Sequence, residues 1–293
     1  MTGGHGAERL IWRLRDTSID VTQGLLMGVI NVTPDSFSDG GLNLEADAAV
    51  SSALDLHRVG AGIIDVGGES TRPGAEPVEA CVEIARVLPV VERLVAEGIV
   101  VSVDTSKAEV ARAAVAAGAQ VVNDVTASSD PEMAPLLAEL GVGVVLMHSS
   151  GEPRTMQEDP RYDDVVAEVA EFLDTRARSL IDAGVDPAAI VVDPGIGFGK
   201  TVTHNLELIA GLESLAELGY PVVLGASRKS FLGAVTEIEE ASARDGVTAV
   251  TTALGFERGA RIFRVHDVAT SRVALAVVAA IVNPQQWDEW SQG

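Results

Sequence analysis

The stretch Gly98-Ile-Val-Val-Ser-Val-Asp-Thr-Ser-Lys107 contains the repeating unit from which the fold of this chain can be predicted. A glycine follows an alanine-rich amphipathic segment, an aliphatic run follows the glycine, and polar residues end the run. Glycine is favoured just after a helix because it adopts the left-handed conformation without strain. A short continuous apolar run is typical of a parallel strand that is buried on both faces. The unit therefore predicts a helix, a strand and a polar loop in succession.

The same unit recurs along the chain. Apolar runs after a glycine lie at 63–66, 99–103, 121–122, 142–147, 190–192, 222–224 and 261–265, and a run at 25–32 makes eight. Helices are expected at 45–59, 78–97, 107–117, 131–140, 163–183, 203–218, 241–258 and 267–282. Strands that alternate with helices predict an α/β fold with a parallel sheet, and eight strands close a (β/α)8 TIM barrel. A doubly wound open sheet is the alternative, but it requires no such even count.

Neither a linker nor a low-complexity tract divides the chain, so we expect a single domain over residues 1–293. Residues 11–24 alternate between apolar and polar side chains, which is typical of a hairpin. We therefore expect residues 1–24 to form a short N-terminal β-hairpin that caps the N-terminal face of the barrel. Residues 284–293 are expected to form a C-terminal tail.

Charge and hydropathy exclude several functional classes. The formal net charge is −22, so neither nucleic acid nor an anionic membrane is an expected partner. The sequence has no apolar run long enough to span a membrane, and residues 1–15 lack the apolar core of a secretory signal. The single cysteine fits a reducing compartment. We expect a cytoplasmic protein in which a phosphate-bearing substrate needs a local group of cations.

Lysine is rare, and its positions are informative. Only three of the 21 Lys and Arg residues are lysines: Lys107, Lys200 and Lys229. Each lies in a polar segment after an expected strand. Because a lysine ammonium is a compact cation with three rotatable donors, its retention at these positions favours specific roles, above all for Lys229.

Four polar side chains end four different strands of the predicted barrel. They are Asp104, Asn123, Asp193 and Lys229. Each alone has a structural interpretation, such as a helix cap, a turn or a tie between loops. Together they are expected at one barrel mouth, where the catalytic groups of TIM barrels lie. Two carboxylates, an amide and an amine suit a flat heterocycle with alternating donors and acceptors.

An anion site is expected beside them. Arg264 and His266 are two residues apart at the end of the last apolar run, so they share a face if the strand geometry persists. The loops after the last two strands form the usual phosphate site of TIM barrels. A structural cap is the alternative for His266, and the role of His148 stays open. The polar, glycine-rich loops 31–41 and 67–74 predict mobile lids.

In their order and spacing, these motifs resemble the signature segments of dihydropteroate synthases. The two loop signatures are Gly28-Val-Ile-Asn-Val-Thr-Pro-Asp-Ser-Phe-Ser-Asp-Gly-Gly41 and Asp65-Val-Gly-Gly-Glu-Ser-Thr-Arg-Pro-Gly74. Segments 102–107, 123–124, 193–200, 227–231 and 264–267 match the family in the same order, and the resemblance spans about residues 25–283. One departure is Met147-His-Ser-Ser-Gly151, where many members have Met-His-Met-x-Gly.

The resemblance implies a Mg²⁺-dependent TIM barrel that is usually a homodimer. Its substrates would be 6-hydroxymethyl-7,8-dihydropterin diphosphate and 4-aminobenzoate, and its products 7,8-dihydropteroate and diphosphate. By motif match, the pterin would be bound by Asp104, Asn123, Met147, Asp193, Phe198, Lys229 and Arg264. Diphosphate would contact Asn31, Thr71, Arg264 and His266, and Mg²⁺ would lie near Asn31 and Asp35. The aminobenzoate pocket would comprise Phe37, Thr71, Pro73, Phe198, Lys229 and Ser230. Asp104, Asp193, Lys229 and Arg264 would be the catalytic residues.

Two rival functions differ in what they require of the sequence. A methyltransferase barrel that acts on methyltetrahydrofolate shares the Asp, Asn, Asp set. It would not need Ser70-Thr-Arg-Pro73 or the Lys229-Ser230 pair. A non-catalytic, pterin-binding paralogue typically loses lid or phosphate residues, and the key ones are all present here.

Overall fold

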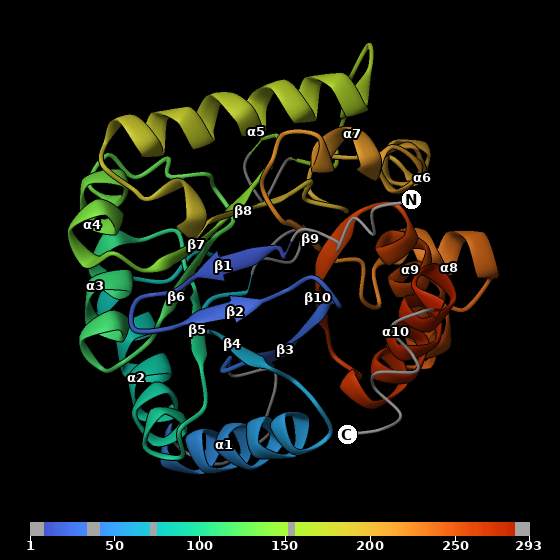
Figure 1. Ribbon diagram of the computed structural model, residues 1–293. Coiled ribbons are helices and arrows are strands. Elements are labelled where there is room, and N and C mark those ends of the chain that lie inside the picture. The colour runs from blue at the N-terminus through green and yellow to red at the C-terminus, as the bar shows by residue number, and fades with distance from the viewer. Residues whose placement is uncertain (1–8, 34–41, 71–74, 152–155, 285–293) are drawn as a thin grey trace, which may run out of the picture.

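The computed structural model describes residues 9–33, 42–70, 75–151 and 156–284, and its centre is a closed barrel of eight parallel strands (Figure 1). The strands are β3 (Leu25–Asn31), β4 (Ile63–Gly67), β5 (Val101–Asp104), β6 (Val121–Asp124), β7 (Gly143–Met147), β8 (Ile190–Asp193), β9 (Val222–Leu224) and β10 (Ala260–Val265). Neighbours in the sequence are neighbours in the barrel, and β10 closes it against β3. The predicted (β/α)8 TIM barrel is therefore confirmed.

Helices surround the barrel as its outer layer (Figure 1). They are α1 (Leu42–Arg58), α2 (Ala80–Ala96), α3 (Ala108–Ala116), α4 (Met133–Leu140), α5 (Val165–Asp182), α6 (Val202–Ala210), α7 (Leu212–Ala216), α8 (Ser230–Thr236), α9 (Asp245–Glu257) and α10 (Val268–Val282). The helix expected at 203–218 was wrong in one respect, since Gly211 divides it into α6 and α7. A Cβ at Gly211 would lie 2.8 Å from a methyl group of Val166 on α5, so the close approach of α5 favours glycine there.

The helix expected at 241–258 begins later, because a 3-10 turn (Ala241–Arg244) precedes α9. The short helix α8, which starts at Ser230, lies between β9 and this turn. Within the part of the chain that the structure describes, every helix is too short or too polar to cross a lipid bilayer.

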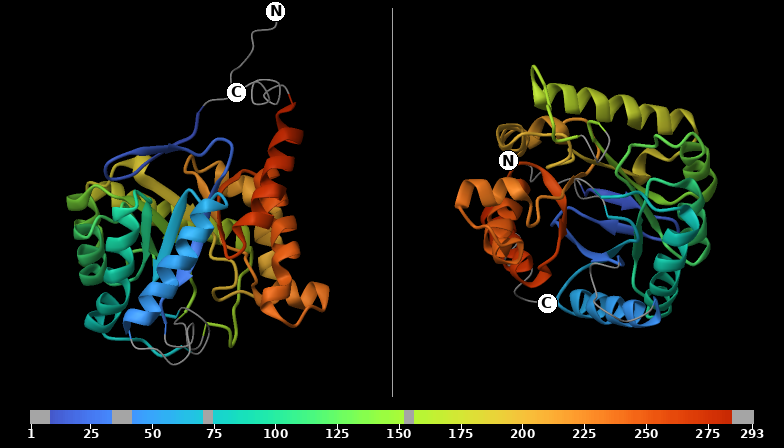
Figure 2. Two further views of the ribbon diagram at one scale, coloured as in Figure 1. Left: turned by 90° about the horizontal axis from the view of Figure 1, so that it is seen from below. Right: turned by 180° about the vertical axis from the view of Figure 1, so that it is seen from behind.

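A short hairpin lies across one end of the barrel (Figure 2). Its strands are β1 (Ile11–Arg13) and β2 (Ser18–Asp20), which pair antiparallel as expected. Trp12 is fully buried, and its indole N–H donates to the carbonyl of Ala189 at 2.9 Å. The ring packs in the barrel interior with residues such as Met27 and Ile63. Apolar side chains thus fill the N-terminal half of the interior.

The same strands carry polar side chains further along, at their carboxyl ends. Side chains alternate along a strand, so Asp65 faces the same side as Ile63, one layer nearer the mouth. The register pairs Gly67 with Asp104 and Asp104 with Asn123. Met147 pairs with Asp193 on the opposite side. The closed barrel therefore gathers residues that are far apart in the sequence into one polar ring.

Candidate active site

The centre of the polar ring is a guanidinium held between two carboxylates. Arg264 on β10 donates from Nε to Oδ2 of Asp65 at 2.6 Å and from Nη2 to Oδ2 of Asp104 at 2.7 Å. Asn123 on β6 donates from Nδ2 to the same oxygen of Asp65 at 3.0 Å. Burial works against the charged guanidinium, but the charges of Asp65 and Asp104 outweigh it and raise the pKa of Arg264. Arg264 is therefore a fixed cation.

One oxygen of Asp104 is available for a ligand. Oδ1 of Asp104 is buried and has no hydrogen-bond partner among the described residues. A buried carboxylate oxygen without a donor is unfavourable, so an N–H group from a ligand would stabilise it. Gly67 leaves space beside it, because a Cβ there would lie 3.5 Å from Cβ of Asp104 and 3.6 Å from Oδ1 of Asn31. Burial raises the pKa of Asp104 to about 7, against the lowering effect of Arg264.

A second buried carboxylate lies across the mouth. Asp193 ends β8, and its Oδ1 accepts a hydrogen bond from the Gly195 N–H at 2.7 Å. Burial raises the pKa of Asp193, and the Lys229 ammonium is the largest opposing influence. Met147, which ends β7, is buried beside it in the register.

Lys229 enters the site from a strained turn after β9. Arg228 has a φ of +60°, a conformation that is uncommon for residues other than glycine. A two-pronged ion pair with Asp245, with both N···O distances at 2.7 Å, holds it there. Nζ of Lys229 donates to the Ile196 carbonyl and lies 4.5 Å from the centre of the Phe198 ring. Burial lowers the pKa of Lys229 to about 8, although Asp193 opposes the shift.

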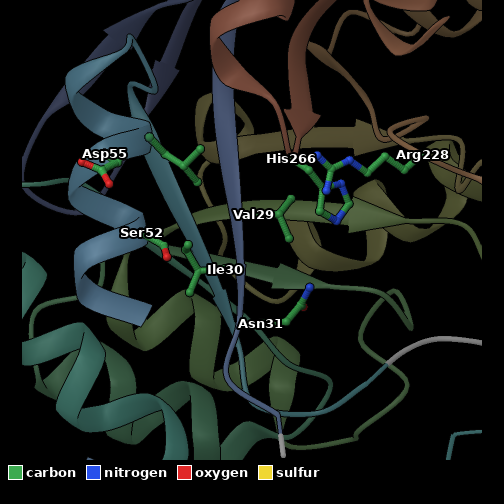
Figure 3. A pocket seen from close by; sticks show the side chains of 8 residues that line it. Val29, Ile30, Asn31, Ser52, Asp55, Arg228 and His266 are labelled. Carbon is green, nitrogen blue, oxygen red and sulfur yellow. The ribbon is translucent and has the colours of Figure 1, made fainter. Parts of the chain in front are cut away.

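A cavity of about 420 Å³ lies between α1 and the ends of β3 and β10 (Figure 3). Asn31, Arg228 and His266 line it, together with Ser52 and Asp55 of α1. Oγ of Ser227 lies 2.9 Å from Nδ1 of His266 and accepts a hydrogen bond from the His266 backbone N–H at 3.2 Å. These two contacts fix the position of the imidazole at the edge of the mouth.

Comparison with known proteins identifies the family. The model of the pterin binding enzyme family matches residues 27–266. A dihydropteroate synthase from Mycobacterium leprae is 49% identical over 265 residues, which cover 87% of this chain and 92% of the relative. The chain belongs to the dihydropteroate synthase family. It is accordingly a transferase of folate biosynthesis.

Solved structures of dihydropteroate synthases agree with this assignment. The Xanthomonas albilineans enzyme with 4-aminobenzoic acid is 45% identical, with a TM-score of 0.88, and the match covers 94% of this chain and 98% of that one. The same enzyme in complex with 7,8-dihydropteroate gives 43% identity and a TM-score of 0.85, with coverages of 92% and 98%.

Most of the site residues expected from the sequence lie in the described part of the barrel. Asp104, Asn123, Met147, Asp193, Phe198, Lys229 and Arg264 surround the mouth, Asn31 and His266 lie at its edge, and Ser230 is exposed at the start of α8. Asp35, Phe37, Thr71 and Pro73 lie outside the described residues. Arg264 and His266 differ in their contacts, because β10 ends between them at Val265. Arg264 turns into the barrel, whereas His266 contacts Ser227.

Sequence reasoning missed Asp65 and left His148 without a role. Asp65 lies inside an apolar strand, where a fully buried carboxylate requires a partner. That requirement was the available signal, since it marks Asp65 as a strand residue that belongs to a polar network. The partner of His148 is Lys200, whose Nζ lies 2.9 Å from its Nδ1. No sequence pattern linked these two residues.

Proposed function

We propose that this chain condenses 6-hydroxymethyl-7,8-dihydropterin diphosphate with 4-aminobenzoate to give 7,8-dihydropteroate and diphosphate. The observation that carries the proposal is the buried, unpartnered oxygen of Asp104 beside the Arg264 guanidinium. The 4-aminobenzoic acid and 7,8-dihydropteroate bound to the Xanthomonas enzyme support the substrate class.

The pterin would bind across the mouth between the two carboxylates. Asp104 and Asp193 would accept hydrogen bonds from its amine and ring N–H groups. One N–H of Asn123 Nδ2 already donates to Asp65, which leaves the acceptor Oδ1 and the second N–H of that amide for the pterin. Lys229 would donate to the ring carbonyl or a ring nitrogen. The pterin faces would contact Met147 and Phe198, and Arg264 would lie along its edge and reach the phosphates.

The reaction would exchange one bond to the pterin methylene carbon for another. The bond to the diphosphate oxygen breaks, and the electron-rich ring stabilises the cation that develops. Asp104 and Asp193, which are both buried, would stabilise this cation electrostatically. Arg264 and His266 would neutralise charge on the leaving diphosphate, and Asn31 and Thr71 would contact it. The aromatic amine then attacks the methylene carbon and loses a proton, so no covalent enzyme intermediate is required.

The aminobenzoate pocket would lie on the Lys229 side. Phe198 and Lys229 are already in contact there, and Ser230 follows at the start of α8. We propose that the ring packs against Phe198 and that Ser230 and Lys229 contact the carboxylate. Phe37, Thr71 and Pro73 would complete the pocket.

We also propose that Mg²⁺ acts with the substrate diphosphate near Asn31 and Asp35. Magnesium usually takes one or two protein oxygens and several from substrate phosphates and water. Oδ1 of Asn31 faces the space above Gly67, and Asn31 shares the cavity with His266. Bound there, the ion would neutralise charge on the leaving group.

A homodimer is the assembly that we propose. The outer face of α9 and α10 bears an apolar groove lined by Val250, Val273, Val277 and Ile281, among others. Val273 and Ile281 are 60% and 71% exposed. Contiguous apolar surface of this kind is typical of subunit interfaces. Replacement of Val273 by Glu should shift the sedimentation coefficient from dimer to monomer, and an unchanged dimer would exclude this face.

A cytoplasmic location is also proposed. The one cysteine of the chain, Cys81, is a free thiol exposed on α2, which fits a reducing compartment. Fractionation of the source cells, followed by detection of the chain in the cytosolic fraction, tests this location.

The release of diphosphate tests the proposed reaction. The enzyme is incubated with the pterin diphosphate and Mg²⁺, and diphosphate is measured before and after the addition of 4-aminobenzoate. We expect rapid release only after the amine is added, with dihydropteroate formed in equal amount. Release that is independent of the amine, or methyl transfer from methyltetrahydrofolate, would contradict the proposal. Omission of Mg²⁺ in a parallel reaction tests the metal.

A further inference from the structure

Lys200 is a buried cation that the proposed reaction does not use. It is 3% exposed, and its ammonium has no carboxylate within ion-pair distance among the described residues. Nζ instead lies 2.9 Å from Nδ1 of His148 and donates to the carbonyl of Phe198 at 3.0 Å. Burial lowers the pKa of Lys200 to about 7, and the nearby Lys229 charge acts in the same direction. An ammonium buried in this way is unfavourable for folding, so its presence calls for a compensating role.

His148 is suited to accept the hydrogen bond from Lys200. It follows β7 directly, is buried, and packs edge to face against Phe172 with ring centres 4.8 Å apart. Burial lowers the pKa of His148 to about 3, and the charge of Lys200 adds to the effect. The imidazole is therefore neutral at pH 7, and one of its nitrogens is an acceptor.

The loop between Lys200 and β8 lies directly on the segment that carries His148. Gly195 has a φ of +64°, and a Cβ there would lie 1.8 Å from the His148 carbonyl oxygen. Gly199 has a φ of +63°, and its Cβ would lie 2.3 Å from the Ser150 carbonyl oxygen. A backbone approach this close excludes any side chain at the two positions. Lys200 thus ties together two segments that are already in contact.

This same loop supplies two contacts to the ammonium of Lys229. The Ile196 carbonyl accepts a hydrogen bond from its ammonium, and the Phe198 ring lies 4.5 Å from Nζ. A shift of the Phe198 carbonyl would move the ring attached to the same residue. The position of Phe198 relative to Lys229 therefore depends on the carbonyl that Lys200 holds.

We propose that Lys200 is a positioning residue that acts with His148 to fix the Phe198 ring and so shapes the 4-aminobenzoate side of the site. The proposal rests on the proposed function, because Phe198 and Lys229 form that pocket. Lys200 touches neither substrate. It acts through the Phe198 carbonyl, and its charge lies close enough to Asp193 to lower the pKa of that carboxyl against the effect of burial.

Measuring the KM for each substrate separately distinguishes a positioning role of Lys200 from a general role in stabilising the fold. In Lys200→Met, we expect the KM for 4-aminobenzoate to rise about tenfold, the effect of losing one hydrogen bond to a charged group. Phe198 is only one of the proposed pterin contacts, and Asp104, Asn123 and Asp193 do not depend on its position, so the KM for the pterin diphosphate should change by less than about threefold. His148→Leu removes the acceptor and should reproduce this pattern. His148→Asn places an amide oxygen near the position of Nδ1 and should restore the normal KM. The double variant should be no worse than Lys200→Met alone.

Tyr162→Phe is the matched control. The Tyr162 hydroxyl donates to the Gly199 carbonyl at 3.0 Å, so the variant removes a hydrogen bond from the same loop without touching Phe198. It should leave both KM values unchanged. The proposal would be overturned if Lys200→Met raised the KM values for both substrates equally. It would also be overturned if the KM for 4-aminobenzoate rose as much in His148→Asn as in His148→Leu. If Lys200→Met does not fold, the comparison of His148→Leu with His148→Asn tests the proposal in its place. A wild-type protein without aminobenzoate-dependent turnover would instead refute the proposed function, on which this inference rests.

Discussion

Replacement of Asp65 by Asn is expected to impair the enzyme far more than it impairs the fold. Asp65 contacts no substrate in our proposal, but its Oδ2 accepts hydrogen bonds from both Arg264 and Asn123. Asparagine preserves the shape of the side chain and removes its charge. The amide oxygen has two lone pairs and can still accept both hydrogen bonds, but the bond to Arg264 is no longer an ion pair and loses its charge-assisted strength.

The expected magnitude follows from the hydrogen bond to Arg264. A hydrogen bond between charged groups contributes about 1.5–3 kcal/mol, and about 1.36 kcal/mol corresponds to a tenfold change in rate. If the lost share of this contribution orients Arg264 for the transition state, kcat/KM for the pterin substrate should fall by about 10-fold, and about 150-fold is the limit for complete loss of the bond. Arg264 keeps its contact with Asp104, so no buried charge is left unpaired. The loss in free energy of unfolding should therefore stay below about 3 kcal/mol.

The assay combines diphosphate release with urea denaturation. Asp124→Asn is the control, because Asp124 is also fully buried at the end of β6, but the donors to it among the described residues are its near neighbours Thr126 and Ser128. Its kcat/KM should stay within about threefold of wild type. An Asp65→Asn variant as active as the wild type, or an Asp124→Asn variant that loses as much activity as Asp65→Asn, would contradict this prediction.

Three further predictions concern charge and packing. Lys229→Ala should abolish turnover and leave the circular dichroism spectrum unchanged; near-normal activity would exclude Lys229 from the site. The pH profile of kcat/KM should be bell-shaped, rising through about pH 7 as Asp104 ionises and falling through about pH 8 as Lys229 loses its proton. In Asp65→Asn, the rising limb should move to lower pH, since the Asp65 charge helps to raise the pKa of Asp104. Trp12→Ala should lower the free energy of unfolding by about 3–5 kcal/mol in urea titrations. The kcat/KM of the folded variant should be unchanged. A loss below about 1 kcal/mol would show that the hairpin adds little to the core.

The fold was predictable because the signal for it is local and repeated. Each apolar run after a glycine, such as 99–103 before Asp104, indicates a buried parallel strand without knowledge of its neighbours. The helix at 203–218 was less predictable, because the break at Gly211 follows from the approach of Val166 on a different helix. The roles of the lid residues, the metal and the dimer stay predictions, because they depend on ligands or on a second chain.

The sequence alone determined that eight strands would close into a barrel and that Asp104, Asn123, Asp193 and Lys229 would meet at its mouth. These conclusions follow from strand order, since the carboxyl ends of all strands in a parallel barrel lie on one side. Only the tertiary structure decided which side chains bond to one another. Asp65 contacts Arg264, which lies 199 positions away in the sequence, and Lys200 contacts His148, which lies 52 positions away. Such pairs depend on the direction of each side chain and on the stagger between strands, and no single segment of the sequence specifies either.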